Sequence, residues 1–335
     1  MHLTKRMLSL LLALFFTLLL PLYCFAASNL SPATTITDGA YYYIRNKNSG
    51  HYLDAENSLN FNVIQYAYHG ALNQTWKAVR ISGNTYRLEN RSPYYQNQGR
   101  KCLSVSEVND EVDLFYYSST LTTQRWMITA NSDSTFTVKS GWDNKVLQTQ
   151  NASSASPANV IKATANGSNS QKWYFEKIPS PQTSISAMKS VFPHEKYWNH
   201  SPGSSWGYTT ITSTACSHHG SCNSNGSCGC NSYQNSIQCM GFAKYIGKRF
   251  FGSDVTSWAK PTNSSSMYFV KPGDYIRFGG HSVIVLTVSA NSDSITVAEC
   301  NYKGKCIIRW GRSVSISEIK SDFSHMHKSP YVLIG

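Results

Sequence analysis

A Gln-x-Trp triplet recurs along the first half of the chain. Its copies are Gln74-Thr75-Trp76, Gln124-Arg125-Trp126 and Gln171-Lys172-Trp173, at intervals of about fifty residues, a period that indicates a structural repeat. Residues 36–178 consist of short aromatic and β-branched runs separated by Gly, Asn, Ser and Asp, with almost no helical periodicity. The triplets close the similar segments 41–76, 86–126 and 136–173. The pattern therefore predicts an all-β region built from three repeats.

Three copies that each end in Gln-x-Trp resemble the ricin-type β-trefoil lectin module. The resemblance covers nearly all of this half and implies a trefoil domain over residues 34–178. It also implies that Trp76, Trp126 and Trp173 form the core around a threefold pseudo-axis, and that each Gln supports a turn.

The resemblance implies sugar binding only in the first repeat. Asp54 would accept hydrogen bonds from sugar hydroxyls, Asn73 would donate one, and Tyr66 or Tyr68 would supply an aromatic platform. The second repeat has Ser104 and Thr123 at the Asp and Asn positions, and the third has Gln148 and Ser170. We therefore expect one weak site, which concentrates the protein on a glycan surface.

The N-terminus has the pattern of a secretory signal peptide. Lys5 and Arg6 precede an apolar run, and Cys24-Phe25-Ala26 resembles a cleavage site, so we expect residues 1–26 to be removed. Lipid attachment at Cys24 is the alternative, but small residues do not precede it. The expected product is a secreted protein, extracellular or associated with the cell wall, with no stable membrane anchor.

Charge narrows the class of partner. The formal net charge of +12 falls by two, to about +10, when Lys5 and Arg6 leave with the signal. Outside a cell this balance favours anionic wall polymers, membrane surfaces or acidic glycans over nucleic acid. The alternative is that the charge only keeps the protein soluble, because the basic residues are scattered.

Eight of the nine cysteines follow the signal, and most of them cluster. Cys216, Cys222, Cys228 and Cys230 lie in a polar loop, and Cys300 and Cys306 bracket a short polar segment. Such clusters in an exported protein predict disulfides. Zinc binding is the alternative for the first cluster, since His218 and His219 lie within it.

Residues 179–190 are predicted to be a linker, because Pro and small polar residues end the repeat pattern there. Residues 191–335 would form a second domain. Its first segment, residues 192–200, carries aromatics and histidines that could line a groove or pack as a strap over the core. We favour the strap.

Cys239 is the candidate nucleophile of this second domain. Phe242, Ala243, Ile246 and Phe250 follow it at helical spacing, after a loop rich in Asn, Ser and Gly, so Cys239 should lie in the first turn of a buried helix. The N–H groups and dipole of a helix N-terminus stabilise a thiolate. The alternative role is that of a small buried side chain or half of a disulfide.

A predicted hairpin carries the candidate base. Two glycines let the chain bend before His281, which begins an apolar strand, and residues 295–301 return as a second strand. Side chains alternate in a strand, so Glu299 and Asn301 should lie opposite or diagonal to His281 and orient its imidazole. Each residue could instead have a purely structural role.

Gln-Cys at a helix start, Pro-Gly-Asp-x-x-x-Phe-x-x-His and Glu-x-Asn together resemble the CHAP family, the cysteine, histidine-dependent amidohydrolases and peptidases of bacterial walls. The resemblance implies an α+β papain-like fold for residues 191–335. It implies Cys239 as nucleophile, His281 as base, and Glu299 with Asn301 as the orienting group. No metal or organic cofactor is implied.

The sequence thus predicts a secreted, monomeric cell-wall hydrolase that cleaves peptidoglycan amide bonds and is targeted by its lectin module. Two alternatives remain open. One is a cysteine protease or toxin acting on host protein, and the other is a non-enzymatic adhesin that binds cell-surface glycans.

Overall fold

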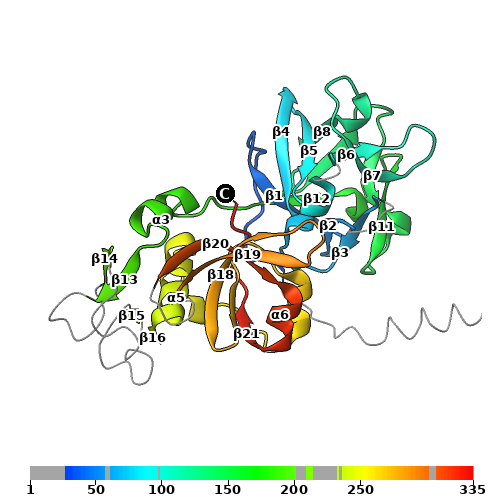
Figure 1. Cartoon of the computed structure of the whole chain (residues 1–335). Coiled ribbons are helices and arrows are strands. Elements are labelled where there is room, and N and C mark those ends of the chain that lie inside the picture. Colours follow the sequence, from blue (N-terminus) through cyan, green and yellow to red (C-terminus); the bar gives the residue numbers. More distant parts are fainter. Residues whose placement is uncertain are drawn as a thin grey trace, which may run out of the picture.

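The computed structural model describes residues 27–56, 61–96, 99–200, 209–213, 232–233, 236–301 and 307–334. The predicted signal peptide and the cluster from Cys216 to Cys230 lie outside these residues. In Figure 1 the N-terminal region lies beside a second region, and the C-terminal segment runs back between them toward β1.

Twelve strands of the described chain form the N-terminal sheet. They are β1 (Tyr41–Asn46), β2 (Tyr52–Ala55), β3 (Val63–Tyr66), β4 (Trp76–Ser82), β5 (Thr85–Asn90), β6 (Arg100–Val105), β7 (Val112–Tyr116), β8 (Trp126–Ala130), β9 (Phe136–Ser140), β10 (Val146–Thr149), β11 (Ala158–Ala163) and β12 (Trp173–Lys177). Short helical turns lie between them: η1 (Leu72–Gln74), α2 (Pro93–Gln96), η2 (Thr122–Gln124), η3 (Gln150–Ala152) and η4 (Asn169–Gln171).

The three triplets have the structural roles predicted for them. Each Trp is fully buried in one hydrophobic core. The indole N–H groups of Trp76, Trp126 and Trp173 donate to the carbonyls of Leu53, Leu103 and Leu147 at 2.9, 2.9 and 3.0 Å. The preceding Gln of each triplet accepts from turn N–H groups upstream and donates back to a turn carbonyl. The all-β trefoil prediction for this region is confirmed.

The second region contains a five-stranded antiparallel sheet in the order β20-β19-β18-β17-β21. Its strands are β17 (Tyr275–Phe278), β18 (His281–Val288), β19 (Ser294–Cys300), β20 (Ile308–Ser315) and β21 (Phe323–His327). The helical segments are α3 (Ile185–Val191), α5 (Gln238–Phe251), η5 (Val255–Ser257), η6 (Ser264–Phe269) and α6 (Ile316–Ser321). Two small hairpins complete it: β13 (Tyr197–His200) with β14 (Thr209–Thr212), and β15 (Ser232–Tyr233) with β16 (Ser236–Ile237).

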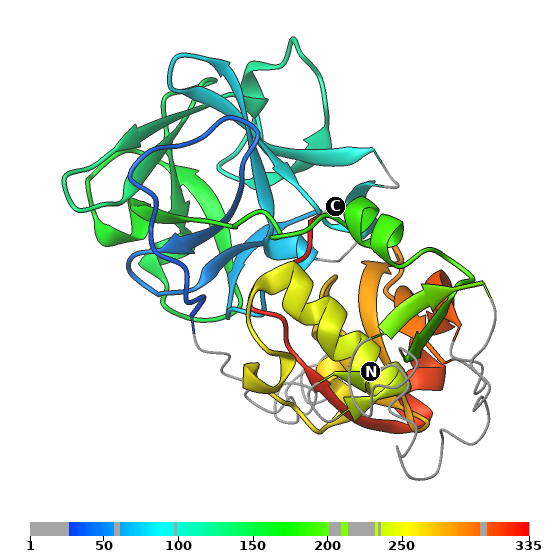
Figure 2. The same cartoon turned by 90° about the vertical axis from the view of Figure 1, so that its left-hand side faces the viewer.

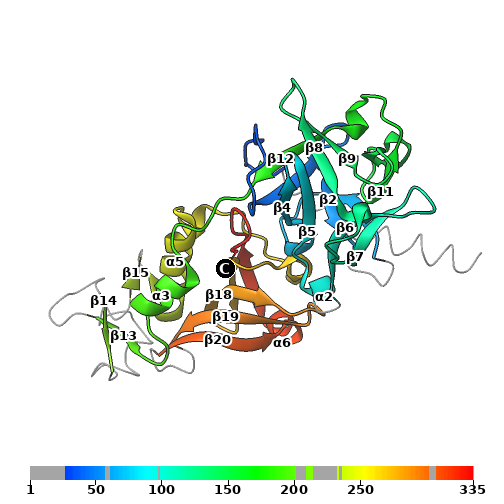
Figure 3. The ribbon, with the colours of Figure 1, turned by 90° about the horizontal axis from the view of Figure 1, so that it is seen from above.

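Both faces of this sheet are covered. Ile284 and Ala298 belong to a core cluster with the apolar face of α5, whereas Val283 and Val297 belong to one with α6 and η6. Figures 2 and 3 show α5 and α6 at different sides of the strands. This alternation along β18 and β19 places their side chains on two faces, as a doubly covered sheet requires.

The segment before α5 packs as a strap. Phe192 and Trp198 are buried and make edge-to-face contacts with Phe242 of α5, at 5.6 and 5.5 Å between ring centroids. His194 stays half exposed, and its Nδ1 accepts a hydrogen bond from the Trp310 N–H at 3.1 Å. The segment therefore supports α5.

Candidate functional site

Cys239 is the second residue of α5 and is 9% exposed. The helix buries the face predicted from the sequence, because Phe242, Ala243, Ile246 and Phe250 are inaccessible. This packing fixes the helix start against β18. The Cys239 thiol contacts His281, and the Ser282 N–H also donates to it.

A tight turn places His281 beside the cysteine. Phe278 of β17 pairs with His281 of β18, and the intervening Gly279 and Gly280 have φ values of 52° and 71°. Two consecutive positive φ values are what a two-residue hairpin turn requires, and glycine adopts them without steric cost. The imidazole therefore begins β18 at a fixed position.

Glu299 joins His281 to a third charged group. His281 Nε2 lies 2.9 Å from Glu299 Oε2, and Glu299 is fully buried. Arg312 of β20 holds the same carboxylate with two hydrogen bonds, from Nε to Oε1 at 2.6 Å and from Nη2 to Oε2 at 2.8 Å. The result is a continuous chain of contacts from Cys239 to Arg312.

The charges favour a thiolate–imidazolium pair. Burial alone would raise the pKa of Cys239, but the hydrogen bond and charge of His281, with smaller effects of Ser282 and Arg277, lower it. Burial alone would lower the pKa of His281, but hydrogen bonds to Cys239 and Glu299 raise it to about 9. Burial alone would raise the pKa of Glu299, but the hydrogen bonds and charges of His281 and Arg312 lower it. These directions favour a thiolate at Cys239 beside a protonated His281 and an ionised Glu299.

Asn301 has a different neighbour from Glu299. Its Nδ2 donates to Gln238 Oε1 at 2.6 Å, and both residues have positive φ, 64° for Asn301 and 53° for Gln238. Asn adopts this conformation readily, whereas Gln does so rarely. The pair thus connects the end of β19 to the residue immediately before Cys239.

Arg277 lies near the cysteine, and further basic groups lie near His325. Arg277 donates to Ser282 Oγ at 2.9 Å, and its charge acts on Cys239. The pKa of His325 falls to about 4, first through burial and then through the charges of Lys260, His327, Arg277 and Lys244. The charge of Arg277 favours the thiolate form of Cys239.

Two further cysteines, Cys102 and Cys300, lie within the described residues. Cys102 is a free buried thiol in the N-terminal region, and burial raises its pKa to about 12. Cys300 is buried in the core beneath α5, and Cys306 lies outside the described residues.

The described part of the chain contains no group of three or more His, Cys, Asp or Glu side chains suited to a metal. None of its helices is long and apolar enough to cross a membrane.

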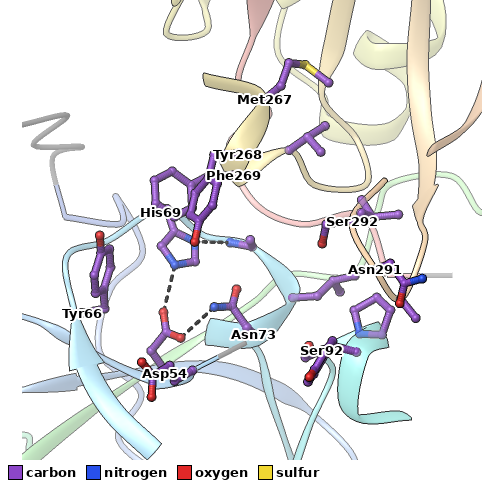
Figure 4. A pocket seen from close by; sticks show the side chains of 18 of the residues that line it. Asp54, Tyr66, His69, Asn73, Ser92, Met267, Tyr268, Phe269, Asn291 and Ser292 are labelled. Carbon is purple, nitrogen blue, oxygen red and sulfur yellow. Dashed lines mark hydrogen bonds and ion pairs between the residues drawn. The ribbon is translucent and has the colours of Figure 1, made fainter. Parts of the chain in front are cut away.

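The predicted sugar-site residues of the first repeat converge (Figure 4). Asn73 Nδ2 donates to Asp54 Oδ1 at 2.7 Å, and His69 Nε2 lies 2.9 Å from Asp54 Oδ2. His69 Nδ1 accepts from the Ala71 N–H at 3.2 Å, so Nε2 carries the ring proton and donates to Asp54. Burial lowers the pKa of His69 and keeps the ring neutral.

The structure distinguishes the two candidate platforms. Tyr66 lines a cavity with Asp54 and Asn73. Tyr68 instead packs against Tyr43 and Tyr52, at 5.3 and 4.9 Å between ring centroids. Of the two candidate platforms, Tyr66 is therefore the one that lines the cavity.

The equivalent positions in the other repeats are occupied differently. Ser104, Thr123 and Ser170 are buried, and Gln148 Oε1 accepts from Gln171 Nε2 at 2.6 Å. Gln148 therefore supports the turn of its own triplet, and neither repeat has a carboxylate at the position of Asp54.

Comparison with known proteins identifies the N-terminal region. The family model described as the ricin-type beta-trefoil lectin domain matches residues 40–173. Residues 40–173 are a ricin-type beta-trefoil lectin domain. A lectin domain of this type implies carbohydrate binding. None of the curated proteins compared matches the chain.

Solved structures resemble parts of the chain. The designed threefold-symmetric protein ThreeFoil is 30% identical, with 41% of this chain and 99% of that one covered and a TM-score of 0.37. The Rhizoctonia solani agglutinin is 23% identical, with 44% and 100% covered and a TM-score of 0.35. An exo-beta-1,3-galactanase from Clostridium thermocellum is 24% identical, with 43% and 31% covered and a TM-score of 0.37.

Sequence reasoning missed His69 and Arg312, and it gave Gln238 no role beyond its place in the Gln-Cys motif. His69 lies five residues before Gln74, and a His beside a predicted Asp–Asn pair could have been considered as a hydrogen-bond donor. Arg312 lies on the strand that follows the strand of Glu299. A basic residue there could have been considered as the partner of a buried Glu. Nothing in the local sequence indicates the positive φ of Gln238.

Proposed function

We propose that this protein is a secreted cysteine hydrolase that cleaves amide bonds in peptidoglycan, with its lectin domain holding it on a glycan surface. The observation that carries the proposal is the contact of Cys239, at the start of α5, with His281, which in turn contacts buried Glu299. A nucleophile, a base and an orienting carboxylate in that order are the elements of cysteine hydrolysis. A papain-like fold of residues 191–335, reached through the resemblance to the CHAP family, is part of the proposal.

The mechanism uses side chains of this chain alone. His281 holds the Cys239 proton, and the thiolate attacks the carbonyl carbon of the amide. Backbone N–H groups at the start of α5 stabilise the resulting oxyanion. The imidazolium donates its proton to the leaving amine as the C–N bond breaks, which leaves a thioester. His281 then takes a proton from water, and hydroxide attack releases the carboxylic acid and the thiol.

Peptidoglycan is the proposed substrate because three features agree with it. The lectin domain implies carbohydrate binding, the chain has an excess of basic residues, and the charges of His281 and Arg277 act on the cysteine. Peptidoglycan joins glycan strands to stem peptides that carry free carboxylates. The signal-like residues 1–26 support export to the compartment where this polymer is found.

Cysteine substitution tests the chemistry. Cys239→Ala and Cys239→Ser should lower the rate of fragment release from purified peptidoglycan by at least about a thousandfold, since the thiolate is the nucleophile. The matched control is Cys102→Ser, which changes another buried free cysteine outside the proposed site. Release would be followed by mass analysis of the fragments, which also identifies the cleaved amide.

Each alternative outcome has a clear meaning. Casein digestion in place of peptidoglycan digestion would replace this proposal with a protease. Wild-type rates in Cys239→Ala would exclude cysteine hydrolysis, and retained glycan binding without any hydrolysis would indicate an adhesin.

A further inference from the structure

The lectin site opens into a cavity that two regions of the chain enclose. The cavity has a volume of about 460 Å³. That lies within the range of roughly 300–1,000 Å³ that is typical of ligand pockets. Asp54, Tyr66 and Asn73 line it from the trefoil, and η6, the β18–β19 loop and α6 line it from the second region. Figure 4 shows Tyr268 and Phe269 of η6 across from the Asp54–Asn73 pair.

Phe269 supports the polar group of the lectin site directly. Its ring stacks on the His69 imidazole, with 4.4 Å between centroids and 12° between planes, and lies 6.2 Å from Tyr66. His69 donates to Asp54, so the position of the carboxylate depends on a ring supplied by the second region.

Tyr268 presents a second aromatic surface to the same cavity. The residue is 76% exposed although it lines the cavity, and its ring contacts Phe269 edge-on with centroids 4.7 Å apart. An exposed aromatic beside hydrogen-bonding groups is the usual composition of a sugar subsite. Asn291, Ser292 and Lys320 provide such groups on this side.

Hydrogen bonds within the second region hold η6, the helix that carries Tyr268, in position. Lys328 Nζ donates to the Phe269 carbonyl at 2.5 Å and to buried Asp274 at 2.6 Å. Asn263 caps the start of η6 by accepting from the Ser265 N–H at 2.9 Å. The backbone that carries Tyr268 and Phe269 is therefore anchored before any ligand arrives, which reduces the entropy lost on binding.

We propose that the glycan site extends onto the second region and takes an oligosaccharide of at least two rings. One ring lies against Tyr66, where Asn73 donates and Asp54 accepts from one of its hydroxyls. Asp54 is only 2% exposed, so just the edge of its carboxylate that lines the cavity meets the ring, and it keeps acceptor capacity beyond the two hydrogen bonds it already receives. The next ring lies against Tyr268, within reach of Asn291, Ser292 and Lys320. The inference rests on carbohydrate binding by the first repeat and adds a subsite outside the lectin domain.

The experiment compares sugars of one and two rings on the full chain. Titration calorimetry would use galactose, N-acetylglucosamine, and their β-1,4-linked disaccharides lactose and N,N′-diacetylchitobiose. Tyr268→Ala should weaken binding of the preferred disaccharide about tenfold, or about 1.4 kcal/mol. It should leave binding of the monosaccharide within about twofold, because the Tyr66 subsite is intact. The matched control is Trp142→Ala, an aromatic that is 46% exposed on the trefoil and outside the cavity.

The outcomes separate this inference from the lectin assignment. If Asp54→Ala loses binding and Tyr268→Ala keeps full affinity for the disaccharide, the second subsite is wrong and the first-repeat site stands. If the wild-type chain binds neither disaccharide more tightly than its monosaccharide, the second subsite is also wrong. If Asp54→Ala retains wild-type affinity, both assignments fail.

Discussion

Glu299 is the carboxylate that contacts both His281 and Arg312. It has no exposed surface, and it lies between the His281 imidazole and the Arg312 guanidinium. A buried carboxylate without partners would take up a proton, whereas these two cations keep it ionised. Its negative charge then stabilises the imidazolium, and the imidazolium stabilises the Cys239 thiolate.

Glu299→Gln is expected to lower kcat at least about tenfold with little change in KM, because the charge acts on the ion pair and has no role in substrate binding. Without the carboxylate the pKa of His281 falls from about 9 and the pKa of Cys239 rises. The thiolate then appears only at higher pH, so the acidic limb of the rate profile should move up. Profiles of kcat and of Cys239 alkylation by iodoacetamide measure both effects.

Asn301→Ala provides the comparison for this prediction. Asn301 donates to Gln238, so its loss should affect the backbone before Cys239 while leaving the His281–Glu299 contact in place. We expect a smaller loss of kcat and an unshifted profile. A larger loss in Asn301→Ala than in Glu299→Gln would mean that the amide is the principal orienting group.

Side-chain alternation was sufficient to predict that His281 and Glu299 meet, because a two-stranded hairpin fixes which residues lie opposite. Val283 pairs with Glu299, so His281 lies diagonal to it. Arg312 could not be placed in this way. Its position depends on a third strand, whose register follows from packing and from an irregularity that no local pattern reveals.

That irregularity is a β-bulge between strands β19 and β20. Between β19 and β20 the pairing passes from Val297 with Arg312 to Ala298 with Trp310, which leaves Gly311 unpaired at a φ of 89°. An extra residue in one strand changes where the next side chain points. The bulge thus positions the Arg312 side chain beside Glu299, two strands away from His281.

Gly311→Ala should destabilise the fold by about 1–2 kcal/mol, because a Cβ is unfavourable at positive φ. Gly50→Ala is the matched control, since Gly50 also has a positive φ, of 74°, and neither added Cβ meets an atom within 4 Å. Both variants should lose similar stability in urea unfolding. Only Gly311→Ala should raise the acidic limb of the rate profile. Equal profiles in the two variants would show that the bulge does not position Arg312.

Element boundaries were predictable where one periodicity dominates. The Cys239 helix and the two strands of the His281 hairpin agree with α5, β18 and β19, because apolar residues repeat at helical spacing in the helix and form a continuous run in β18. The segment of η6 gives no such signal, since Ser264-Ser265-Ser266 precedes its aromatics. Its conformation depends on Lys328 and on the trefoil surface, both distant in the sequence.

At the scale of the whole molecule, the two regions share a hydrophobic core. Tyr43 and Tyr52 of the trefoil belong to one buried cluster with Phe251, Tyr331 and Val332 of the second region. The Tyr43 hydroxyl donates to the Gly70 carbonyl at 3.0 Å and accepts from the Val332 N–H at 3.1 Å. Sequence repeats indicate what packs within the trefoil, but they do not indicate which of its tyrosines face another part of the chain.

This shared core predicts cooperative unfolding. In urea, loss of glycan binding and exposure of Cys239 to a thiol reagent should follow one transition, because one buried cluster contains side chains of both regions. Tyr43→Ala should lower the free energy of unfolding by about 3–5 kcal/mol and separate the two transitions, since it opens a cavity between the regions and leaves the Val332 N–H without its acceptor.

Tyr42→Ala is the matched control, because Tyr42 is equally buried but packs inside the trefoil against Phe175. It should lower the midpoint while both probes still report one transition. Separate transitions in the wild-type chain would show that the interface contributes little to folding.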